Sequence, residues 1–479
     1  MTSANRALRN HEVLDKIKAL AGPGGYCDAP DRMQLYLTSW RNKWVGATPL
    51  IVLPDSTAQL AEIVKICAAH GLPIVPQGGN TGLVDGGIPS REGHEVLLNL
   101  SRMNKIRNLD PVGSNVTVEA GVILQILQQT ADEAGFLFPL SMASEGSATI
   151  GGTVACNAGG TAVLRYGNMR DLVLGLEVVL ADGSIYAGLK RLRKDNAGYN
   201  LNHYFIGAEG TLGIITAAVL KLFPKPRQRV TAIAAIPDPA TALDLLALFK
   251  AECAEHLTAF EIMSQGALAL VIKNIPGTRL PCADAAPHYL LIELSSSGTG
   301  LPLREIFEQL AGRAMEEGKI LDAAIAESGA QVREFWALRE GIPPALRQEG
   351  RSIHFDISLP LDQIADFLEH AEVKIKAAMP EVTIIPFGHI GDGNMHYNMY
   401  VPGHLSDEAY LHCKRTIQDI VYGDVTLRHG SISAEHGIGV ERKRELLKHR
   451  AAHDFDLMRQ IKKALDPNNI LNPGRIFDV

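Results

Sequence analysis

The sequence predicts an α+β protein with more than one domain. Its first half alternates strand-like and helix-like segments around three glycine-rich tracts, and its second half alternates again after a proline-containing linker. The chain has 479 residues, which allows about two to four domains at roughly 100–200 residues each.

The first elements form a β-α-β unit. Residues 50–53 are an apolar strand stopped by Pro54, and Ser56 to Gln59 has the form of a capping box that opens a helix. The apolar residues of that helix share one face, and Gly71 suits the position after its last turn. Residues 72–75 form a second strand, so the next segment hangs from a strand end, where α/β proteins often bind ligands.

That next segment is Pro76-Gln77-Gly78-Gly79-Asn80-Thr81-Gly82-Leu83. Because glycine has no Cβ, its three glycines allow the backbone to approach a neighbour closely or to adopt positive φ. The amides and the threonine hydroxyl form a set of donors suited to a pyrophosphate. An ordinary glycine-rich turn is the alternative interpretation.

Two more glycine-rich tracts follow. A predicted strand at residues 115–119 and a helix at 122–134, closed by Gly135, precede the tract at 144–160, and the tract at 207–215 leads into another strand. Three tracts separated in this way favour loops that converge on one extended cofactor. The chain has neither G-x-G-x-x-G after a strand nor G-x-x-x-x-G-K-[ST], so a Rossmann nicotinamide site and a P-loop are unsupported.

The second half predicts an α+β domain with helices on one face of an antiparallel sheet. Residues 221–227 contain two prolines and are the predicted linker, and the chain is expected to be helical again from about Tyr410. The clearest predicted strands are 230–236 and 288–294, and the clearest helices are 240–253 and 303–317.

The sharpest chemical signal is Gly388-His389-Ile390-Gly391-Asp392-Gly393-Asn394-Met395-His396. Its internal glycines favour a turn that brings both imidazoles together. Two histidines and one carboxylate are a common ligand set for a divalent metal, and Glu435 offers the carboxylate. Adjacent side chains of extended backbone point in opposite directions, so Glu435 and His436 are expected to have different partners. A structural or solvated role is the alternative, since the chain has 16 histidines.

Three arginines, Arg333, Arg339 and Arg347, accompany a helix-like run that begins at Gln331. Each alone is expected to be a solvated surface charge. An arginine aimed at the metal site would instead bind a carboxylate through two hydrogen bonds.

Composition excludes several classes of protein. The formal net charge of −7 gives no support for nucleic-acid binding. No apolar run is long enough for a membrane span, and Met1 to Asn10 lacks the apolar core of a secretory signal. The six cysteines form no CxxC pair, which favours reduced thiols and a cytoplasmic location.

Several long motifs in order resemble the vanillyl-alcohol-oxidase-type flavoproteins, and within them the FAD-linked D-2-hydroxyacid dehydrogenases, the D-lactate and D-2-hydroxyglutarate dehydrogenase group. The resemblance runs from about Trp40 to Arg475. Its motifs are PQGGNTGLVDGG, ATIGGTVACNAGG, RYGNMRDLVLGLEVVLADG, RKDNAGYNLNHYFIGAEGTLGIIT, FGHIGDGNMHYN, SAEHGIG and LDPNNILNPGR.

The resemblance implies a two-part FAD-binding domain at residues 1–225, a substrate or cap domain at 226–425, and a helical segment at 426–479 that returns to the FAD domain. It implies non-covalent FAD, because residues 76–87 lack the histidine that tethers the flavin in some relatives. The residues it implies for the FAD site are Pro76, Gln77, Gly78, Gly79, Asn80, Thr81, Gly82, Leu83, Ser147, Thr149, Gly151, Gly152, Asn157, Gly159, Gly210, Gly213, Ile214, Ile215 and Asn472.

The resemblance also implies a catalytic set. His389, His396 and Glu435 match the ligands of a divalent metal, often zinc, and His436 matches the proposed general base. The residues that match substrate-binding positions are Asn398 and Arg339. The chain departs from the glutarate-specific pattern at two places, where a threonine is replaced by Pro343 and a lysine by His354. Specificity for a glutarate-type substrate is therefore an open question.

The implied activity is the FAD-dependent, metal-assisted oxidation of a D-2-hydroxyacid, such as D-2-hydroxyglutarate or D-lactate, to the 2-oxoacid. The expected electron acceptor is an electron-transfer protein or a quinone, and a homodimer is possible. Two alternatives stay open from the residues alone. One is a metal hydrolase that uses no flavin, and the other is a flavin-binding protein without turnover.

Overall fold

The computed structural model describes residues 3–283 and 285–479, which form two compact units. The first unit comprises residues 1–159, 168–224 and 435–479, and the second comprises 160–167 and 225–434. The predicted α+β class is confirmed, since each unit combines helices with sheets that are largely antiparallel. The boundary at 224/225 falls inside the predicted linker, of which Phe223–Pro224 is the short strand β11.

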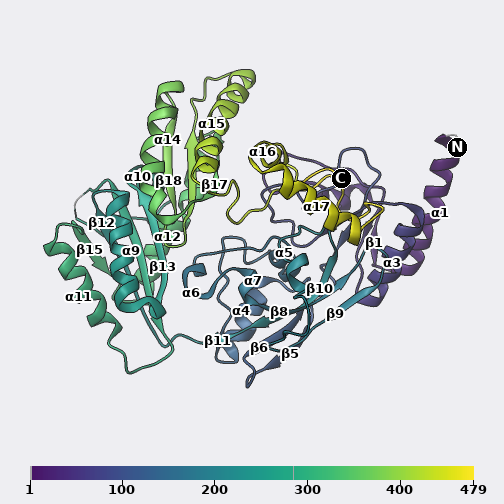
Figure 1. Cartoon of the computed structure of the whole chain (residues 1–479), viewed down its shortest axis with the longest axis horizontal. Coiled ribbons are helices and arrows are strands. Elements are labelled where there is room, and N and C mark those ends of the chain that lie inside the picture. The colour runs from purple at the N-terminus through teal and green to yellow at the C-terminus, as the bar shows by residue number, and fades with distance from the viewer. Residues whose placement is uncertain (1–2, 284) are drawn as a thin grey trace. The chain divides into compact units, whose positions relative to one another are not determined.

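The first unit contains three sheets (Figure 1), with strand orders β1-β2-β4-β3, β5-β6-β10-β8-β9 and β11-β7. Its strands are β1 Tyr26–Cys27, β2 Ile51–Val52, β3 Ile74–Gln77, β4 Val96–Asn99, β5 Ile106–Asp110, β6 Asn115–Glu119, β7 Phe136–Leu137, β8 Val173–Val179, β9 Ile185–Gly188, β10 Ile214–Lys221 and β11 Phe223–Pro224. Its helices are α1 Ser3–Ala21, α2 Pro30–Leu37, α3 Thr57–His70, α4 Leu124–Glu133, α5 Ile150–Ala155, α7 Met169–Leu172, α8 Asn202–Phe205, α16 Lys443–His449 and α17 Ala452–Leu465.

Helix α3 has the ends that the sequence predicts. The Ser56 hydroxyl accepts from the Gln59 amide, and Gly71 ends the helix in the left-handed conformation at φ 61°. The Gln59 side chain completes the cap by accepting from the amide of Asp55, one residue before the capping serine. The flanking strands β2 and β3 both pair in parallel with β4, which lies between them. The β-α-β connection therefore skips one strand.

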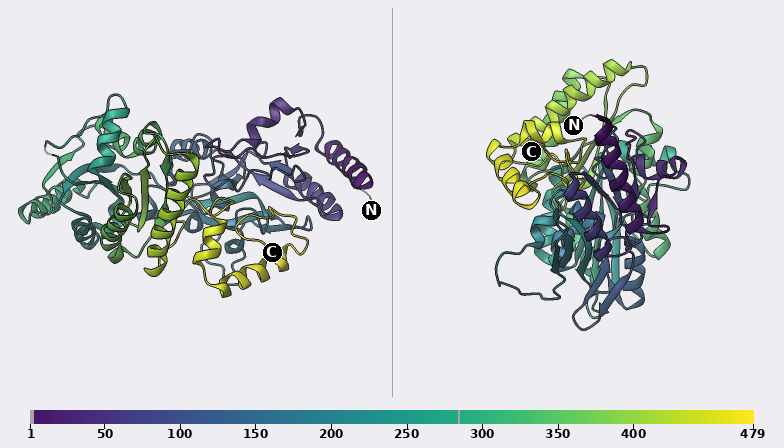
Figure 2. Two further views of the ribbon diagram at one scale, coloured as in Figure 1. Left: turned by 90° about the horizontal axis from the view of Figure 1, so that it is seen from above. Right: turned by 90° about the vertical axis from the view of Figure 1, so that its right-hand side faces the viewer.

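The C-terminal segment adds to the edge of this parallel sheet. Leu471 makes a parallel bridge with Ile74 of β3, and both Ile470 and Leu471 are buried in the core under α1 and α3. Figure 2 shows α1, in purple, lying along α3 in this unit. Strand β3 ends at Gln77, so the first glycine-rich loop starts beside the last residues of the chain.

The second unit is built on one antiparallel sheet with strand order β15-β12-β14-β13-β18-β19-β16 (Figure 1), to which β17 adds by pairing with β19. Its strands are β12 Gln228–Ile236, β13 Leu257–Ser264, β14 His288–Ser296, β15 Asp322–Ile325, β16 Ser352–Ile353, β17 Asp356–Ser358, β18 Thr383–His389 and β19 Asn394–Tyr400. Its helices are α6 Val163–Tyr166, α9 Pro239–Cys253, η1 Ala254–His256, α10 Gln265–Asn274, α11 Leu303–Glu316, α12 Gly329–Glu340, α13 Ile342–Gln348, η2 Leu361–Gln363, α14 Ile364–Ala378 and α15 Asp407–Leu427.

Helices cover both faces of this sheet, so the expectation of helices on one face is wrong. On one face, α10, α12 and α13 pack against Met263 and Phe387. On the opposite face, α9 packs Phe249 against Phe260 of β13, and α14 packs Phe367 against Tyr397 of β19. Every residue of β13 is buried, as expected for a strand that is covered on both sides.

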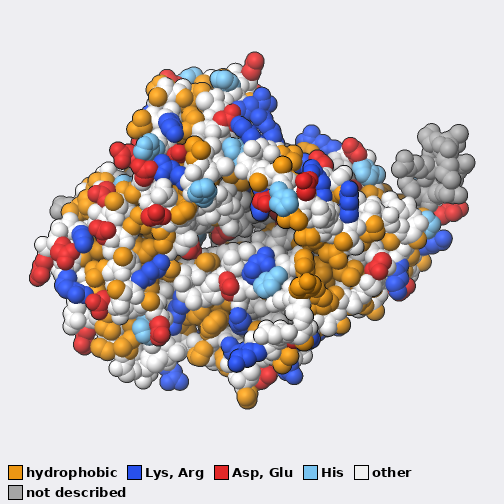
Figure 3. All heavy atoms as spheres, viewed as in Figure 1, with side chains coloured by type: hydrophobic (Ala, Val, Ile, Leu, Met, Phe, Trp, Pro, Cys, Tyr) orange, Lys and Arg blue, Asp and Glu red, His pale blue; other side chains and the backbone are white. Residues whose placement is uncertain are grey.

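The surface mixes charged and hydrophobic side chains. On the face shown in Figure 3, acidic and basic side chains are interspersed. No helix among residues 3–283 and 285–479 combines the length and the low polarity needed to cross a bilayer. All six cysteines are free thiols in the structure.

A buried lysine fixes the C-terminal segment to the first unit. Lys462 is almost fully buried in α17, and its ammonium donates to Thr211 O at 2.7 Å, to Asp466 Oδ2 at 2.6 Å and to Leu471 O at 2.8 Å. Replacing Lys462 by an apolar group removes the charge that neutralises Asp466, which keeps only the amides of Ile470 and Leu471, and takes away the donor to the two carbonyls.

We therefore expect Lys462→Met to lower the free energy of unfolding of the first unit by about 3–5 kcal/mol, the usual cost of breaking a buried ion pair. Urea unfolding followed by circular dichroism measures the change. Lys463→Met is the matched control, because Lys463 is exposed one position along the same helix. Equal unfolding midpoints for the two variants would contradict a stabilising role of Lys462.

Candidate active site

The two motif histidines lie on one β-hairpin in the second unit. Strand β18 ends at His389 and β19 begins at Asn394, and the register pairs His389 with Asn394 and Phe387 with His396. The two imidazoles are therefore diagonal neighbours on one face, with ring centroids 5.3 Å apart. Gly393 is required in the turn, since its φ is 92° and a Cβ there would lie 2.5 Å from Leu359 O. The predicted turn that brings both imidazoles together is confirmed.

Asn394 and Asp356 connect this hairpin to strand β17 and to the segment that ends at Ala434. Asn394 Nδ2 donates to Asp356 Oδ1 and to Ile357 O, each at 3.0 Å, so strand β17 is held against β19. The Asp356 carbonyl then accepts from the amide of Ala434 at 3.1 Å. The residue after Ala434 is Glu435, the carboxylate predicted as a metal ligand.

His389, His396 and Glu435 each offer a ligand atom, and these three atoms lie within 4.8 Å of one another. Asp356, Glu435 and His436 form a second group within the same limit. The donor set of two imidazoles and one carboxylate fits a divalent metal such as zinc, which favours nitrogen and oxygen ligands in small numbers. The three residues predicted as ligands are thus compatible with one ion.

Glu435 and His436 do not point apart as expected. His436 Nε2 lies 3.3 Å from Glu435 Oε1. The expectation assumed extended backbone, whereas both residues lie in bends that lead into the turn at Gly437, whose φ is 81°. The two side chains therefore share one environment.

Sequence reasoning missed Glu261, which organises the histidine site. Glu261 lies in β13 and is buried, with its Oε1 2.7 Å from His389 Nδ1 and its Oε2 accepting from Arg339 Nε at 2.8 Å. Burial by itself would raise the pKa of the Glu261 carboxyl, but the charges and hydrogen bonds of His389 and Arg339 outweigh it and lower the pKa to about 2. The available signal was a charged residue inside an otherwise uncharged strand.

Glu261 sets the orientation and the tautomer of His389. An ionised carboxylate beside Nδ1 favours the proton on that nitrogen, so Nε2 is the nitrogen with the lone pair needed to bind a metal. This arrangement of carboxylate and histidine is the usual support of a metal-binding imidazole.

The predicted substrate-binding residues lie in the same unit. Of the three arginines on the α12–α13 run, Arg339 is buried and stacks over the Phe387 ring at 4.8 Å, whereas Arg333 and Arg347 are exposed. Asn398 follows His396 on the same face of β19, and its Oδ1 accepts from the Phe355 amide at 3.1 Å. His354 is the residue before Phe355, and its Nε2 lies 2.7 Å from Ser352 Oγ.

The glycine-rich tracts predicted to bind FAD meet in the first unit. A Cβ on Gly78 would lie 2.3 Å from Thr149 Oγ1, and one on Gly79 would lie 1.8 Å from Ser147 O, so the first loop needs glycine to lie against the second tract. A Cβ on Gly210 would lie 2.5 Å from Pro76 Cγ, which places the third tract against the same loop. Positive φ in the first loop falls on Asn80, so Gly78 and Gly79 serve close approach, whereas a Cβ on Gly82 would meet nothing within 4 Å.

Other predicted FAD residues support the loop from within the protein. Gln77 Nε2 of the side chain donates to Tyr36 O and Gly87 O. Asn157 Oδ1 accepts from the backbone amide of Arg170. Ile214 and Ile215 are buried in β10. The side chains of Gln77 and Asn157 therefore hold the backbone of the glycine-rich loops in place.

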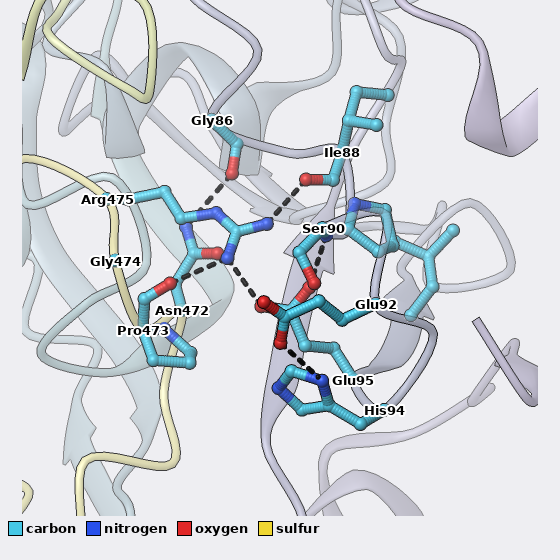
Figure 4. Close-up of polar contacts among 12 residues, drawn as sticks. Gly86, Ile88, Ser90, Glu92, His94, Glu95, Asn472, Pro473, Gly474 and Arg475 are labelled. Carbon is cyan, nitrogen blue, oxygen red and sulfur yellow. Dashed lines mark hydrogen bonds and ion pairs between the residues drawn. The ribbon is translucent and has the colours of Figure 1, made fainter. Parts of the chain in front are cut away.

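Asn472 and Arg475 hold the loop from the C-terminal side, as Figure 4 shows. Asn472 Nδ2 donates to Gly86 O at 3.1 Å and to Glu209 O at 2.7 Å, and Arg475 forms a buried ion pair with Glu95 at 2.5 Å. Arg475 also donates to the carbonyl of Ile88. The first loop is therefore fixed at its far end by the last residues of the chain.

Two buried oxygen atoms make the region where the glycine-rich tracts meet Asn472 suitable for a polar ligand. Thr149 Oγ1 and Asn472 Oδ1 are buried and have no hydrogen-bond partner within the described residues. Buried polar atoms normally have partners, so both are available to a bound group. Together with the glycine backbone, they fit the phosphates and sugars of a dinucleotide.

Comparisons with known proteins agree with this arrangement. A family model described as FAD linked oxidases, C-terminal domain, matches residues 225–476, and one described as FAD binding domain matches residues 48–187. The chain is 36% identical over 96% of its length to the mitochondrial D-2-hydroxyglutarate dehydrogenase of Arabidopsis thaliana, covering 80% of that protein. It is 35% identical over 94% of its length to the D-2-hydroxyglutarate dehydrogenase of Xanthomonas citri, covering 93% of it.

This chain belongs to the FAD-linked D-2-hydroxyacid dehydrogenase group. The predicted FAD-dependent enzyme class is thereby confirmed. The chain is also 35% identical over 93% of its length to a protein of Schizosaccharomyces pombe, of which it covers 84%. That protein is named a putative mitochondrial D-lactate dehydrogenase. The fold is also that of p-cresol methylhydroxylase, with a TM-score of 0.77 at 19% identity over 98% of this chain and 97% of the other.

Glu261 gives a prediction about metal affinity. Glu261→Gln keeps the side-chain volume but removes the charge that holds the proton on His389 Nδ1. Since loss of such a supporting partner typically costs about 10–100-fold in metal affinity or activity, we expect a loss of that size in zinc affinity. Competition with a chromophoric chelator measures it.

Glu293→Gln is the matched control for Glu261→Gln. Glu293 is buried on the neighbouring strand β14, where its Oε2 accepts from Thr231 Oγ1 at 3.0 Å and Trp336 Nε1 at 3.1 Å. Equal zinc affinity in the two variants would show that Glu261 does not support a metal ligand.

Proposed function

We propose that the dehydrogenase oxidises a D-2-hydroxyacid to the 2-oxoacid with non-covalent FAD and a divalent metal, namely zinc. The observation that carries the metal is the His389–His396 pair on one hairpin, oriented by the buried carboxylate of Glu261 and grouped with Glu435. FAD is supported by the FAD-binding family match, and the substrate class is supported by the names of the relatives.

The residues have separate tasks in this proposal. When bound, FAD supplies the acceptor for the hydride of the substrate Cα, and a metal on His389, His396 and Glu435 supplies a Lewis acid for the hydroxyl and carboxylate. Arg339 positions the substrate carboxylate through its Nη groups, while its Nε stays on Glu261. Asn398 holds the substrate next to the histidines.

His436 is proposed as the general base. The hydroxyl proton moves to Nε2 of His436, and the electron pair of the Cα–H bond leaves as hydride. Glu435 Oε1 lies 3.3 Å from that nitrogen, so the proposed base lies next to a proposed metal ligand.

Two residues bear on the tail of the substrate. D-2-hydroxyglutarate is favoured by the relatives, whereas Pro343 and His354 depart from the residues expected for a distal carboxylate. We include both D-2-hydroxyglutarate and D-lactate in the substrate class. The electron acceptor is proposed to be an electron-transfer protein or a quinone, and the location to be cytoplasmic.

Anaerobic reduction of the bound flavin tests the function. Purified protein is mixed with D- and L-enantiomers of lactate, malate and 2-hydroxyglutarate, and bleaching of the flavin absorbance is followed. We expect bleaching by at least one D-hydroxyacid and by no L-hydroxyacid. Protein without flavin bands would favour a flavin-independent hydrolase, and flavin that no hydroxyacid reduces would favour a binding protein without turnover.

His389→Ala and metal removal test the metal. Both changes should abolish turnover but leave FAD bound, because the proposed FAD residues lie in the first unit and His389 lies in the second. The measurements are elemental analysis, flavin content and flavin reduction on the same samples. Full activity in protein shown to be metal-free would refute a catalytic metal.

His436→Ala tests the general base. We expect the rate of flavin reduction in stopped-flow experiments to fall by about 10²–10⁴-fold, with a much smaller change in the substrate dissociation constant. Metal content must be measured on the same variant, since His436 touches Glu435. Reduction at the wild-type rate with metal present would assign the base to another residue.

A further inference from the structure

Glu209 is a half-buried carboxylate that none of the predicted roles includes. It lies in the third glycine-rich tract with φ 50°, and its Oε1 accepts from the Ile438 amide at 2.7 Å and its Oε2 from the Gly439 amide at 2.8 Å. Burial raises the pKa of the Glu209 carboxyl, and the two amide hydrogen bonds oppose that change. The two amides belong to the turn that directly follows Glu435 and His436.

The first glycine-rich loop holds the other side of that turn. The Val84 carbonyl accepts from the Val440 amide at 2.9 Å. Gly439 has φ 51°, and a Cβ there would lie 2.1 Å from Val84 O, so the backbone of the turn lies directly on the loop. The Gly439 carbonyl accepts in turn from the Ile476 amide at 3.0 Å.

The backbone of Glu209 is fixed by the remaining FAD segments. Its amide donates to Ala155 O in the second tract at 2.9 Å, and its carbonyl accepts from Asn472 Nδ2 at 2.7 Å. One residue thus connects the second tract, the third tract and the C-terminal segment to the turn after His436. All of these contacts lie within the first unit.

We propose that Glu209 is a positioning residue that couples FAD binding to the placement of Glu435 and His436. The coupling rests on the function proposed above for those two residues and for the FAD tracts. Ligand binding that orders the tracts fixes the backbone of Glu209, and its carboxylate then fixes the turn through two amides. Without that order, the turn loses the hydrogen bonds that define its conformation.

Only a carboxylate satisfies both amides at once. An ionised carboxylate offers two acceptor oxygens, whereas glutamine offers one acceptor and one donor. In Glu209→Gln, an NH₂ group therefore faces one of the two amide donors in either orientation of the side chain. Side-chain volume is unchanged, so the variant tests the hydrogen bonds separately from packing.

Hydrogen–deuterium exchange on the full chain, with and without FAD, tests the coupling. In the wild type, FAD should slow exchange in the peptide that covers residues 435–441. In Glu209→Gln loaded with FAD, that peptide should exchange about 10–100-fold faster than in the loaded wild type, as expected for losing a hydrogen bond to a charged group. Glu177→Gln is the control, since Glu177 bonds Thr57 and Thr216 elsewhere in the same unit.

Three outcomes decide the proposal without any measurement of turnover. Equal protection of the 435–441 peptide in loaded wild type and loaded Glu209→Gln overturns it, as does the absence of FAD-dependent protection in the wild type. If Glu209→Gln does not retain FAD, Glu209→Asp replaces it, because aspartate keeps both acceptors on a shorter arm. Loaded Glu209→Asp should show intermediate protection, and full protection in it overturns the proposal.

The rate of flavin reduction is a second and independent test of the role of Glu209. Loaded Glu209→Gln should reduce its flavin more slowly than Glu177→Gln with the same substrate dissociation constant. If no hydroxyacid reduces the wild-type flavin, the proposed function fails, while the exchange measurements still report on Glu209.

Discussion

A carboxylate that is wholly or partly removed from water needs hydrogen-bond donors, and this constraint organises the functional segments of both units. In the second unit, Glu261 is met by His389 and Arg339, which fixes the imidazole of one motif histidine and the guanidinium expected at the substrate. In the first unit, Glu209 is met by the amides of Ile438 and Gly439. The chemistry-bearing side chains are thus held by residues that do not themselves have to touch a ligand.

Local sequence patterns predicted most elements of the fold, because capping, apolar periodicity and glycine at helix ends act within a few residues. Helix α9 and strand β12 begin and end within about two residues of the predicted ranges. The insertion of β4 between β2 and β3 was not predicted, because strand order depends on contacts far apart in the chain. A mostly apolar strand such as β12 indicates that both faces of the sheet are covered, because a strand with one exposed face alternates apolar and polar residues.

The candidate site was predictable where its residues are close in sequence. His389 and His396 share a short glycine turn, so their meeting follows from local geometry. Glu261 is 128 residues before His389, and no spacing in the sequence relates the two. The Glu435–His436 contact was not predicted, because the expectation assumed extended backbone, whereas both residues lie in bends before Gly437 with φ 81°.

The two glutamates act on their segments by different means, and this determines what each can control. Glu261 acts through side-chain charge, so it governs the proton on His389 Nδ1 and the direction of Arg339. Glu209 acts through backbone amides, so it governs the path of the chain after His436 and leaves side-chain protonation alone. One carboxylate therefore tunes the ligand chemistry of the histidine pair in the second unit, and the other ties the order of the segment after His436 in the first unit to the proposed cofactor loops.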